Sequence, residues 1–403
     1  MSKEHSTTPE EAVVPLRLEL RDLLRAKIVK TVEEILDEEL SVALSCDRHE
    51  RTDERCGYRN GKQVRRITTE MGPVTLSVPR GRVQQDGGVT TEFESRVLPR
   101  YARRTRRVDE AILGIYLAGA NTRRIRKALQ PLLGEEHLSK SAVSRVVNRL
   151  KGYFLQWQQR DLSQECYPIL YLDGLNLKVR LARRVISVPV LAALGVAPDG
   201  QKQLVALRLA VSESSACWGR LIDSLQKRGL PDPLLLVTDG HAGLGKARRS
   251  WPSPKVQRCT VHKLQNLLDH CPVHARGEMK RDYAKIVTAR DGIAAREAYD
   301  SFLAKWRTLC PSVAESLEEA GTELLTFYEF PKKMWKSLRS TNALENLNRE
   351  FRRRTKTQGS FSTETAALIL LYGLVAFGQI NLRKIDGYKA MKELPDQGWT
   401  VAA

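Results

Sequence analysis

The sequence predicts an α/β protein in which helices flank a mixed sheet and a mainly helical region precedes it. Two observations lead to this prediction. After about residue 165, apolar runs with strand character come first and helical segments follow, which is typical of a sheet covered by helices. Before that point, the longest patterned segments repeat near 3.6 residues, the period of an amphipathic helix. A length of 403 residues favours two or three domains.

The sheet region is expected to begin with strands and to end with helices. The expected strands cover residues 167–173, 175–180, 184–196, 202–211, 234–238 and 255–258. Helices are expected at 215–229, through most of 262–330, and at 341–354 and 363–382.

The first hundred residues are expected to contain a long helix and a small β structure. Apolar residues recur at helical spacing between about 10 and 45. A charged loop then ends at Arg59-Asn60-Gly61, and Asn-Gly is a strong turn signal. Strands are expected at 63–68 and 73–79, and an extended, exposed connector at 80–98.

Three short helices are expected next, at about 108–119, 122–133 and 139–152, with Thr122 and Ser139 as candidate N-caps. Short helices joined by tight turns fit a helix-turn-helix, in which one helix enters the major groove of DNA. A three-helix unit that packs without touching DNA is the alternative, but the neighbouring arginines favour DNA. The candidate DNA-binding residues here are Arg103, Arg104, Arg106, Arg107, Ser141, Ser144 and Arg145.

The charge of the chain indicates an anionic partner. The formal net charge is +19 and the isoelectric point is about 9.7, and Lys and Arg that neutralise phosphates drive nucleic-acid binding. No stretch approaches the ~18 apolar residues of a membrane span. The seven cysteines are scattered, unlike those of a disulfide scaffold. We therefore expect no membrane partner and a soluble, reduced, intracellular protein.

Two aspartates are candidates for metal-dependent chemistry. Asp173 and Asp239 each end an apolar strand and each precede a glycine. In open α/β sheets, sites form beyond strand ends. If the two strands are neighbours, the carboxylates repel each other unless a divalent cation lies between them, and phosphodiester chemistry uses such cations. The alternative is that each Asp only begins a turn, which is common.

Glu345 is the third candidate. On a helix, Leu344, Leu347 and Phe351 would share an apolar face, while Glu345, Arg349 and Arg352 would share another. A carboxylate there could hold a metal while arginines grip the DNA backbone. The alternative is a capping box, with Asn342 as N-cap and Glu345 as its partner. The candidate DNA-binding residues of this segment are Arg349, Arg352, Arg353, Arg354 and Lys356.

With these residues the chain resembles the Mutator-type transposases of bacterial insertion sequences, from about residue 50 to 380. The block from Thr341 to Lys356, in register with the two Asp-Gly signals, is the most specific part. The other matching segments are Arg59-Asn60-Gly61, Pro79-Arg80, Tyr116–Arg124, Ser139–Arg145, Val256–His262 and Phe330-Pro331.

The resemblance implies a ribonuclease H-like catalytic core with a helical insertion at about 262–335. It implies that Asp173, Asp239 and Glu345 form the catalytic, metal-binding triad, with Mg²⁺ or Mn²⁺ as the metal. It also implies that water attacks a phosphodiester at the element's end, and that the freed 3′-OH attacks another strand.

The same resemblance assigns Cys259 and His262 to a Cys-x-x-His element that supports the active site. A zinc site that adds His270, Cys271 and His274 is an alternative, although the spacing is not that of a standard finger. His241 could touch DNA or cap the following helix. Trp306 could stack on a base, but a place in the core is favoured. Cys46, His49 and Cys56 offer only three obvious ligands, and loop roles are favoured for them.

Together these expectations give three regions: an N-terminal helical and small β region at 1–107, a helix-turn-helix domain at 108–160, and the catalytic domain at 165–403. The expected partners are double-stranded DNA, as terminal inverted repeats and target, and a second copy of the chain, since two element ends must meet. The rival functions are a nuclease of the same fold without strand transfer and a DNA-binding regulator without catalysis. A third, an RNA-binding protein, lacks any aromatic-rich sheet motif.

Overall fold

The computed structural model describes residues 9–84, 89–120, 122–133, 139–181, 184–210, 212–357 and 363–395. The chain divides into two compact units. The first unit comprises Met1–Tyr116 and Ala120–Val147, and the second comprises Leu117–Gly119 and Asn148–Ala403. The expected domain boundaries at 107 and 160 stay predictions.

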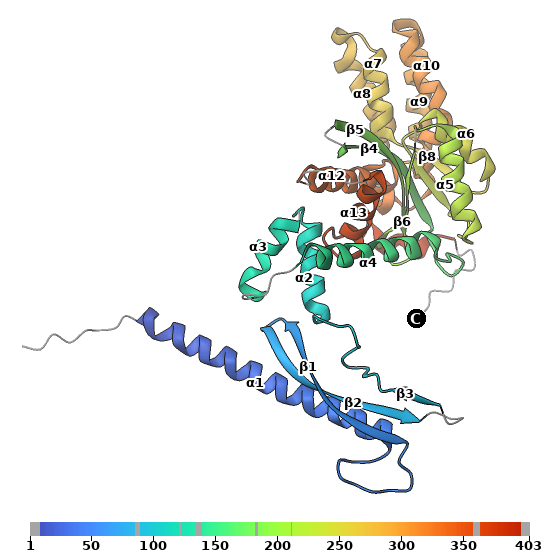
Figure 1. The fold of residues 1–403 in the computed structure, drawn as a ribbon. Helices are drawn as coiled ribbons and strands as arrows, with labels where there is room; N and C mark the ends of the chain where they lie inside the picture. Colours follow the sequence, from blue (N-terminus) through green and yellow to red (C-terminus); the bar gives the residue numbers. More distant parts are fainter. Residues whose placement is uncertain are drawn as a thin grey trace, which may run out of the picture. The chain divides into compact units, whose positions relative to one another are not determined.

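The first unit begins with the expected long helix, α1 (Pro9–Leu44), which packs on a small antiparallel sheet (Figure 1). The sheet has the order β1 (Gly57–Thr69), β2 (Gly72–Gln84) and β3 (Thr90–Glu92). Leu36 of α1 is fully buried against apolar residues of β1 and β2. Both long strands extend further than expected, so residues 80–84 continue β2 and are not part of a connector.

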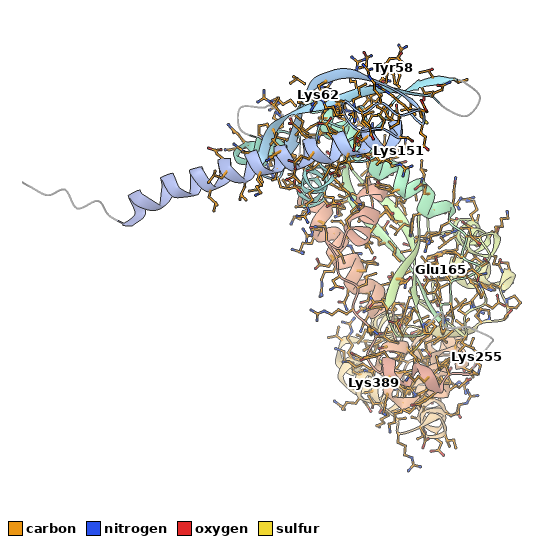
Figure 2. The ribbon with its side chains drawn as sticks, turned by 90° about the horizontal axis from the view of Figure 1, so that it is seen from below. Tyr58, Lys62, Lys151, Glu165, Lys255 and Lys389 are labelled. Atoms are coloured by element: carbon orange, nitrogen blue, oxygen red, sulfur yellow. The ribbon has the colours of Figure 1, made fainter. Side chains whose placement is uncertain are left out.

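The turn expected at Arg59-Asn60-Gly61 is wrong, because these residues lie inside β1. The pairing with β2 shifts register between Arg59 and Lys62, which marks a β-bulge. Gly61 adopts a φ of 71°, a conformation that both a bulge and a turn require of glycine. Beyond the bulge, Lys62 (Figure 2) donates to the Asp37 carboxylate at 2.8 Å and ties β1 to α1.

Three helices follow, as expected: α2 (Arg106–Leu117), α3 (Thr122–Leu133) and α4 (Lys140–Gln159). The N-cap role of Ser139 is confirmed, since its hydroxyl accepts the backbone N–H of Ala142 at 3.1 Å. Thr122 is instead the first residue of α3.

The second unit contains a five-stranded mixed sheet, which confirms the predicted α/β class. Its order is β6-β5-β4-β7-β8, in which β4, β5 and β6 are antiparallel neighbours and β4, β7 and β8 are parallel neighbours. The runs expected at 167–173 and 175–180 form one strand, β4. The strands are β4 (Ile169–Leu181), β5 (Arg184–Val196), β6 (Lys202–Leu209), β7 (Leu235–Thr238) and β8 (Lys255–Arg258).

Helices cover both faces of this sheet, with α5 and α6 on one face and α12 and α13 on the other (Figure 1). The fully buried Trp218 of α5 belongs to the core that includes Leu172 of β4 and Leu236 of β7. In the described part of the chain, no helix has both the length and the apolar character that crossing a membrane requires. The helices are α5 (Ser215–Lys227), α6 (Ala242–Ala247), α11 (Trp335–Leu338), α12 (Asn342–Thr357) and α13 (Glu364–Ala376).

Between β8 and α11, the chain forms a separate helical group with its own core. The group comprises α7 (Thr260–His270), α8 (Arg276–Val287), α9 (Gly292–Leu309) and α10 (Pro311–Ala320). Trp306 of α9 is fully buried in this core and donates its indole N–H to Asp282 at 3.3 Å. The core placement favoured for Trp306 is therefore confirmed, and its ring is not free to stack on a base.

Replacing Trp306 by alanine should destabilise the helical group. The large cavity left by a fully buried indole costs about 3–5 kcal/mol in the free energy of unfolding. Ile293→Ala on the same helix, where the side chain is 75% exposed, should change it by less than about 0.5 kcal/mol. Denaturant unfolding followed by circular dichroism would measure both. Equal effects of the two variants would contradict the described core.

Candidate active site

Asp173 lies within β4, not at its end, because the strand continues through Leu181. The sequence prediction of a strand end is therefore wrong for this residue. The parallel neighbour β7 does end here: Leu172 pairs with Thr238, the last residue of β7. Asp173 and Asp239 each follow one member of that pair, so the two strands are neighbours at this point, which is the condition on which the sequence prediction depended.

The surroundings of Asp173 disfavour the ionised form of its carboxyl group. Its side chain is only 6% exposed, and burial together with the negative charge of Asp239 raises its pKa to about 7. Glu345 raises this pKa further, whereas His262 lowers it. A carboxyl group with this pKa is only partly ionised at neutral pH, so a nearby cation would strongly favour its charged form.

Asn348 makes a contact with Asp173 that the sequence did not reveal. Its side-chain amide donates to Asp173 Oδ2 at 3.2 Å, between α12 and β4. Asn348 is only 2% exposed, and its carbonyl oxygen is buried without a hydrogen-bond partner among the described residues.

The loop after β7 holds Asp239 through its own backbone. Asp239 Oδ1 accepts the N–H of His241 at 2.8 Å, and Gly240 between them adopts a φ of 86°. His241 Nδ1 in turn accepts the N–H of Gly243 at 3.1 Å. His241 therefore caps α6, which is the second of the two roles considered from the sequence.

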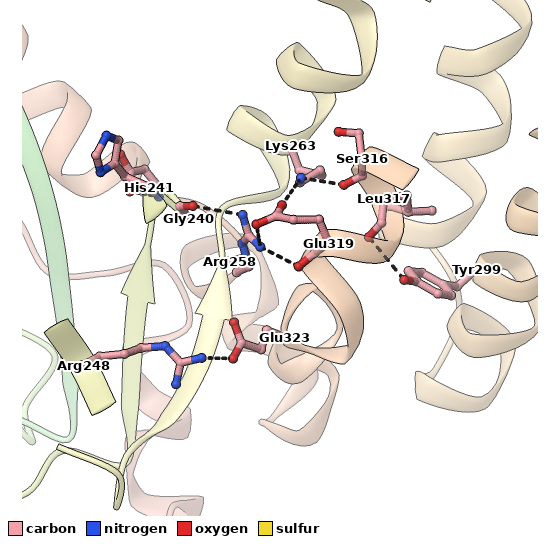
Figure 3. A network of polar contacts seen from close by, with 11 residues as sticks. Gly240, His241, Arg248, Arg258, Lys263, Tyr299, Ser316, Leu317, Glu319 and Glu323 are labelled. Atoms are coloured by element: carbon pink, nitrogen blue, oxygen red, sulfur yellow. Dashed lines mark hydrogen bonds and ion pairs between the residues drawn. The ribbon is translucent and has the colours of Figure 1, made fainter. Parts of the chain in front are cut away.

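A polar network, in which Arg258 and Lys263 are buried and Glu319 is exposed, connects this loop to the helical group (Figure 3). Arg258, at the end of β8, donates to the carbonyl oxygen of Gly240 at 3.0 Å and to the Glu319 carboxylate of α10 at 2.7 Å. Lys263, which is 3% exposed, donates to the same carboxylate at 2.9 Å and to Ser316 O at 2.7 Å. The helical group thereby restrains the loop that carries Asp239.

Glu345 lies in the first turn of α12, and Thr341 holds its carboxylate. The Thr341 hydroxyl donates to Glu345 Oε1 at 3.2 Å, and His262 Nδ1 lies 3.8 Å from the same oxygen. The alternative considered from the sequence, a capping box with Asn342 as N-cap, does not form, because α12 begins at Asn342 and the residue before the helix is Thr341. Thr341 is fully buried, and its backbone N–H donates to Cys259 Sγ at 3.4 Å.

Cys259 and His262 form an interacting pair beside Glu345. A hydrogen bond with Cys259 raises the pKa of His262 to about 9, and the charge of Glu345 adds to this effect. Burial alone would raise the pKa of the Cys259 thiol, but hydrogen bonds with His262 and Thr341 outweigh burial and lower it.

One set of three side chains could bind a metal ion directly. Ligand atoms of Cys259, His262 and Glu345 lie within 4.8 Å of one another. Within the described ranges this is the only such set of His, Cys, Asp or Glu groups. The zinc alternative with His270, Cys271 and His274 is therefore not formed, nor is a cluster of Cys46, His49 and Cys56. Asp173, Asp239 and Glu345 do not meet this distance criterion either, although their charges interact.

The basic residues expected to bind DNA are mostly accessible on α12. Arg349, Arg352 and Lys356 are exposed. Arg353 is exposed as well and pairs with Glu350 at 2.7 Å. Arg354 is half-buried and donates to the carbonyl oxygen of Gln379 at 3.4 Å.

In the first unit, Ser141, Ser144 and Arg145 form an exposed group on α4. Arg103 is exposed, whereas Arg104 is half-buried and pairs with Asp109 at 2.8 Å. The exposed Arg106 and Arg107 pair with carboxylates too: Arg106 with Glu110 at 2.8 Å, and Arg107 with Glu70 at 3.6 Å.

Comparison with known proteins identifies the family. The sequence pattern of the family described as "Transposase, Mutator family" matches residues 1–381. This chain belongs to the Mutator family of transposases. The resemblance stated from the sequence is therefore confirmed.

Several transposases of insertion sequence elements are similar to this chain along most of their length. The transposase for insertion sequence element ISRM5 of Rhizobium meliloti is 33% identical over 98% of this chain and 97% of its own. The transposase for IS406 of Burkholderia multivorans is 34% identical over 86% of this chain and 87% of its own. The transposase for IS256 in transposon Tn4001 of Staphylococcus aureus is 31% identical over 91% and 93%.

The interaction between Cys259 and His262 in this Mutator-family transposase predicts that Cys259→Ala lowers the pKa of His262. The hydrogen bond with Cys259 is the largest cause of the raised value, so the pKa should fall from about 9 toward its ordinary value near 6.5. Nuclear magnetic resonance titration of the imidazole would measure it, with His262→Asn identifying the signal. Cys271→Ser, at the other end of α7, is the control and should leave it unchanged. A pKa still near 9 in Cys259→Ala would contradict the pairing.

Proposed function

We propose that this transposase cleaves and joins DNA strands at a site formed by Asp173, Asp239 and Glu345. The observation that carries the proposal is the parallel pairing of β4 with β7, which puts two carboxylates side by side where β7 ends. Helix α12 adds a third carboxylate, close enough for its charge to raise the pKa of Asp173. We infer that the mixed sheet is the ribonuclease H-like core that the family resemblance implies.

The residues present fit a hard divalent cation, Mg²⁺ or Mn²⁺. Such ions prefer oxygen ligands, and Asp173 and Asp239 supply carboxylates whose mutual repulsion a cation would relieve. Asn348, whose amide N–H donates to Asp173 Oδ2, also carries a buried carbonyl oxygen that has no hydrogen-bond partner among the described residues. Asp173, Asp239 and Glu345 would hold the metal, which stabilises the attacking and leaving oxygens of phosphodiester chemistry.

The reaction we propose has two steps. Water attacks a phosphodiester at the element's end, so that a P–O bond to the new water oxygen forms and the bond to the 3′ oxygen breaks. The departing 3′ oxygen takes a proton and becomes the 3′-OH. That 3′-OH then gives up its proton and attacks a phosphodiester of another strand, and the displaced 3′ oxygen takes up a proton. The first step consumes one phosphodiester bond, whereas the second breaks one and forms one.

Two basic regions would hold the DNA. The exposed Arg349, Arg352 and Lys356 follow Glu345 along α12 and would bind backbone phosphates next to the carboxylates. In the first unit, α2, α3 and α4 would act as a helix-turn-helix that recognises the terminal inverted repeats, with Ser141, Ser144 and Arg145 on the exposed face. Because two ends must be joined, we expect at least a dimer.

Removing any of the three carboxylates should abolish cleavage. Asp173→Asn, Asp239→Asn and Glu345→Gln keep side-chain size but lose charge, so cutting of an end-sequence duplex with Mg²⁺ or Mn²⁺ should fall by at least about a hundredfold. Glu350→Gln, on the same helix and paired with Arg353, is the matched control and should retain activity. A carboxylate variant that keeps full activity would remove that residue from the proposal.

The same assay separates a transposase from a simple nuclease. Duplex with a labelled 3′-OH end should yield longer, joined strands when target DNA is present. Cleavage without any joined product would favour the nuclease, and binding without cleavage would favour the regulator.

Arg352→Ala should weaken binding to DNA of any sequence. A side chain that contacts phosphate contributes through counterion release, so the slope of log K against log salt should fall by about 1. Fluorescence anisotropy at several salt concentrations would measure the slope. Arg296→Ala is the control, because Arg296 lies on α9 and pairs with Asp300. An unchanged slope in Arg352→Ala would place this side chain outside the DNA contact.

A further inference from the structure

We propose that Asn348 is a positioning residue for the metal site: it fixes one oxygen of the Asp173 carboxylate and thereby determines how tightly the site binds its divalent cation. The inference rests on the proposed function, since it assumes that Asp173 is a metal ligand. It assigns a role to a residue that holds no formal charge and that the sequence pattern did not single out as part of the site.

The geometry joins two elements that are distant in sequence. Asn348 lies one helical turn after Glu345 on α12, and its amide N–H reaches Asp173 Oδ2 on β4 at 3.2 Å. A single helix therefore carries one proposed ligand and restrains another. The apolar residues Leu344, Leu347 and Phe351 are buried at 0–2% exposure and fix the rotation of this helix.

The hydrogen bond from Asn348 opposes rotation of the Asp173 carboxylate. Its carboxylate is buried near the negative charges of Asp239 and Glu345, and a free carboxylate would rotate to separate the charges. The amide of Asn348 donates to Oδ2 and holds this oxygen in place, which restrains the rotation of the whole carboxylate. Donors that orient metal ligands in this way raise metal affinity.

A purely structural role explains Asn348 poorly. Its carbonyl oxygen is buried and has no hydrogen-bond partner among the described residues. An unsatisfied buried acceptor destabilises a fold, and an apolar residue of the same size would avoid that cost. The amide is thus better explained by what it does to Asp173 than by the stability of α12.

The test compares metal affinity with stability. In the full-length chain, Asn348→Leu removes the amide and keeps the branched shape and the number of side-chain heavy atoms. Mn²⁺ alone is titrated into the protein, and free Mn²⁺ is followed by electron paramagnetic resonance. We expect the dissociation constant to rise about 10–100-fold, the melting temperature without metal to stay equal or rise, and excess Mn²⁺ to restore part of the cleavage activity.

Thr355→Val is the matched control, because Thr355 is a buried polar residue two turns further along α12 whose hydroxyl bonds only within the helix. It should leave Mn²⁺ affinity unchanged. Asn348→Met, with a more adaptable side chain, is measured in parallel. Mn²⁺ affinity within about twofold of wild type in a folded Asn348 variant would overturn the proposal. Failure of both apolar variants to fold would also overturn it, because the amide would then serve the fold itself.

The same titration separates this inference from the proposed function. Asp173→Asn should abolish the Mn²⁺ binding that wild type shows. If Asp173→Asn binds Mn²⁺ as wild type does, the assignment of Asp173 as a ligand fails. If Asp173→Asn loses binding while Asn348→Leu keeps it, only the positioning role of Asn348 fails.

Discussion

The register between β4 and β7 is the constraint on which the site depends. Leu172 lies opposite Thr238, so that Asp173 and Asp239 emerge together where β7 ends. A slip by one residue would turn Asp173 to the other face of the sheet, away from α12. The apolar residues before each aspartate are fully buried, and their burial makes such a slip costly. Burial of these apolar residues therefore keeps Asp173 and Asp239 near each other although their negative charges repel.

Each carboxylate accepts a hydrogen bond from a different donor, and the three donors belong to different segments of the chain. Asn348 holds Asp173 from α12, the turn at Gly240 holds Asp239 from its own loop, and Thr341 holds Glu345 from the residue before the helix. Cys259 and His262 connect to the last of these through Thr341. The three carboxylates repel one another, and hydrogen bonds from an amide, a backbone N–H and a hydroxyl hold them in place. These donors are neutral, so they do not cancel the negative charge that would attract a cation.

Local patterns predicted the elements well but not their relations. The strand at 184–196 and the Ser139 cap depend on neighbours in sequence, and both were predictable. The Asn60-Gly61 signal was misread because a positive φ serves a bulge as well as a turn. Asp173 was placed at a strand end because Asp-Gly resembles a turn, whereas pairing with β5 carries the strand onward. The contacts of Asn348 with Asp173 and of Thr341 with Cys259 were not predictable, since these partners lie far away in the chain and only the fold brings them together.

Helix α12 carries Glu345, one of the proposed metal ligands, and the arginines proposed to bind DNA, so the proposal makes metal binding and DNA binding depend on the position of one helix. Its buried face, Leu344 and Phe351, sets the rotation of the helix against the rest of the second unit. The same rotation directs Asn348 inward to Asp173 and leaves Arg349 and Arg352 exposed. These residues lie at fixed angles around the helix axis, because 3.6 residues complete a turn. A change in the core that rotated α12 would therefore displace the proposed ligand Glu345, the amide of Asn348 and the proposed phosphate-binding arginines together. Correct packing of α12 is therefore required both for the proposed metal binding and for the proposed DNA binding.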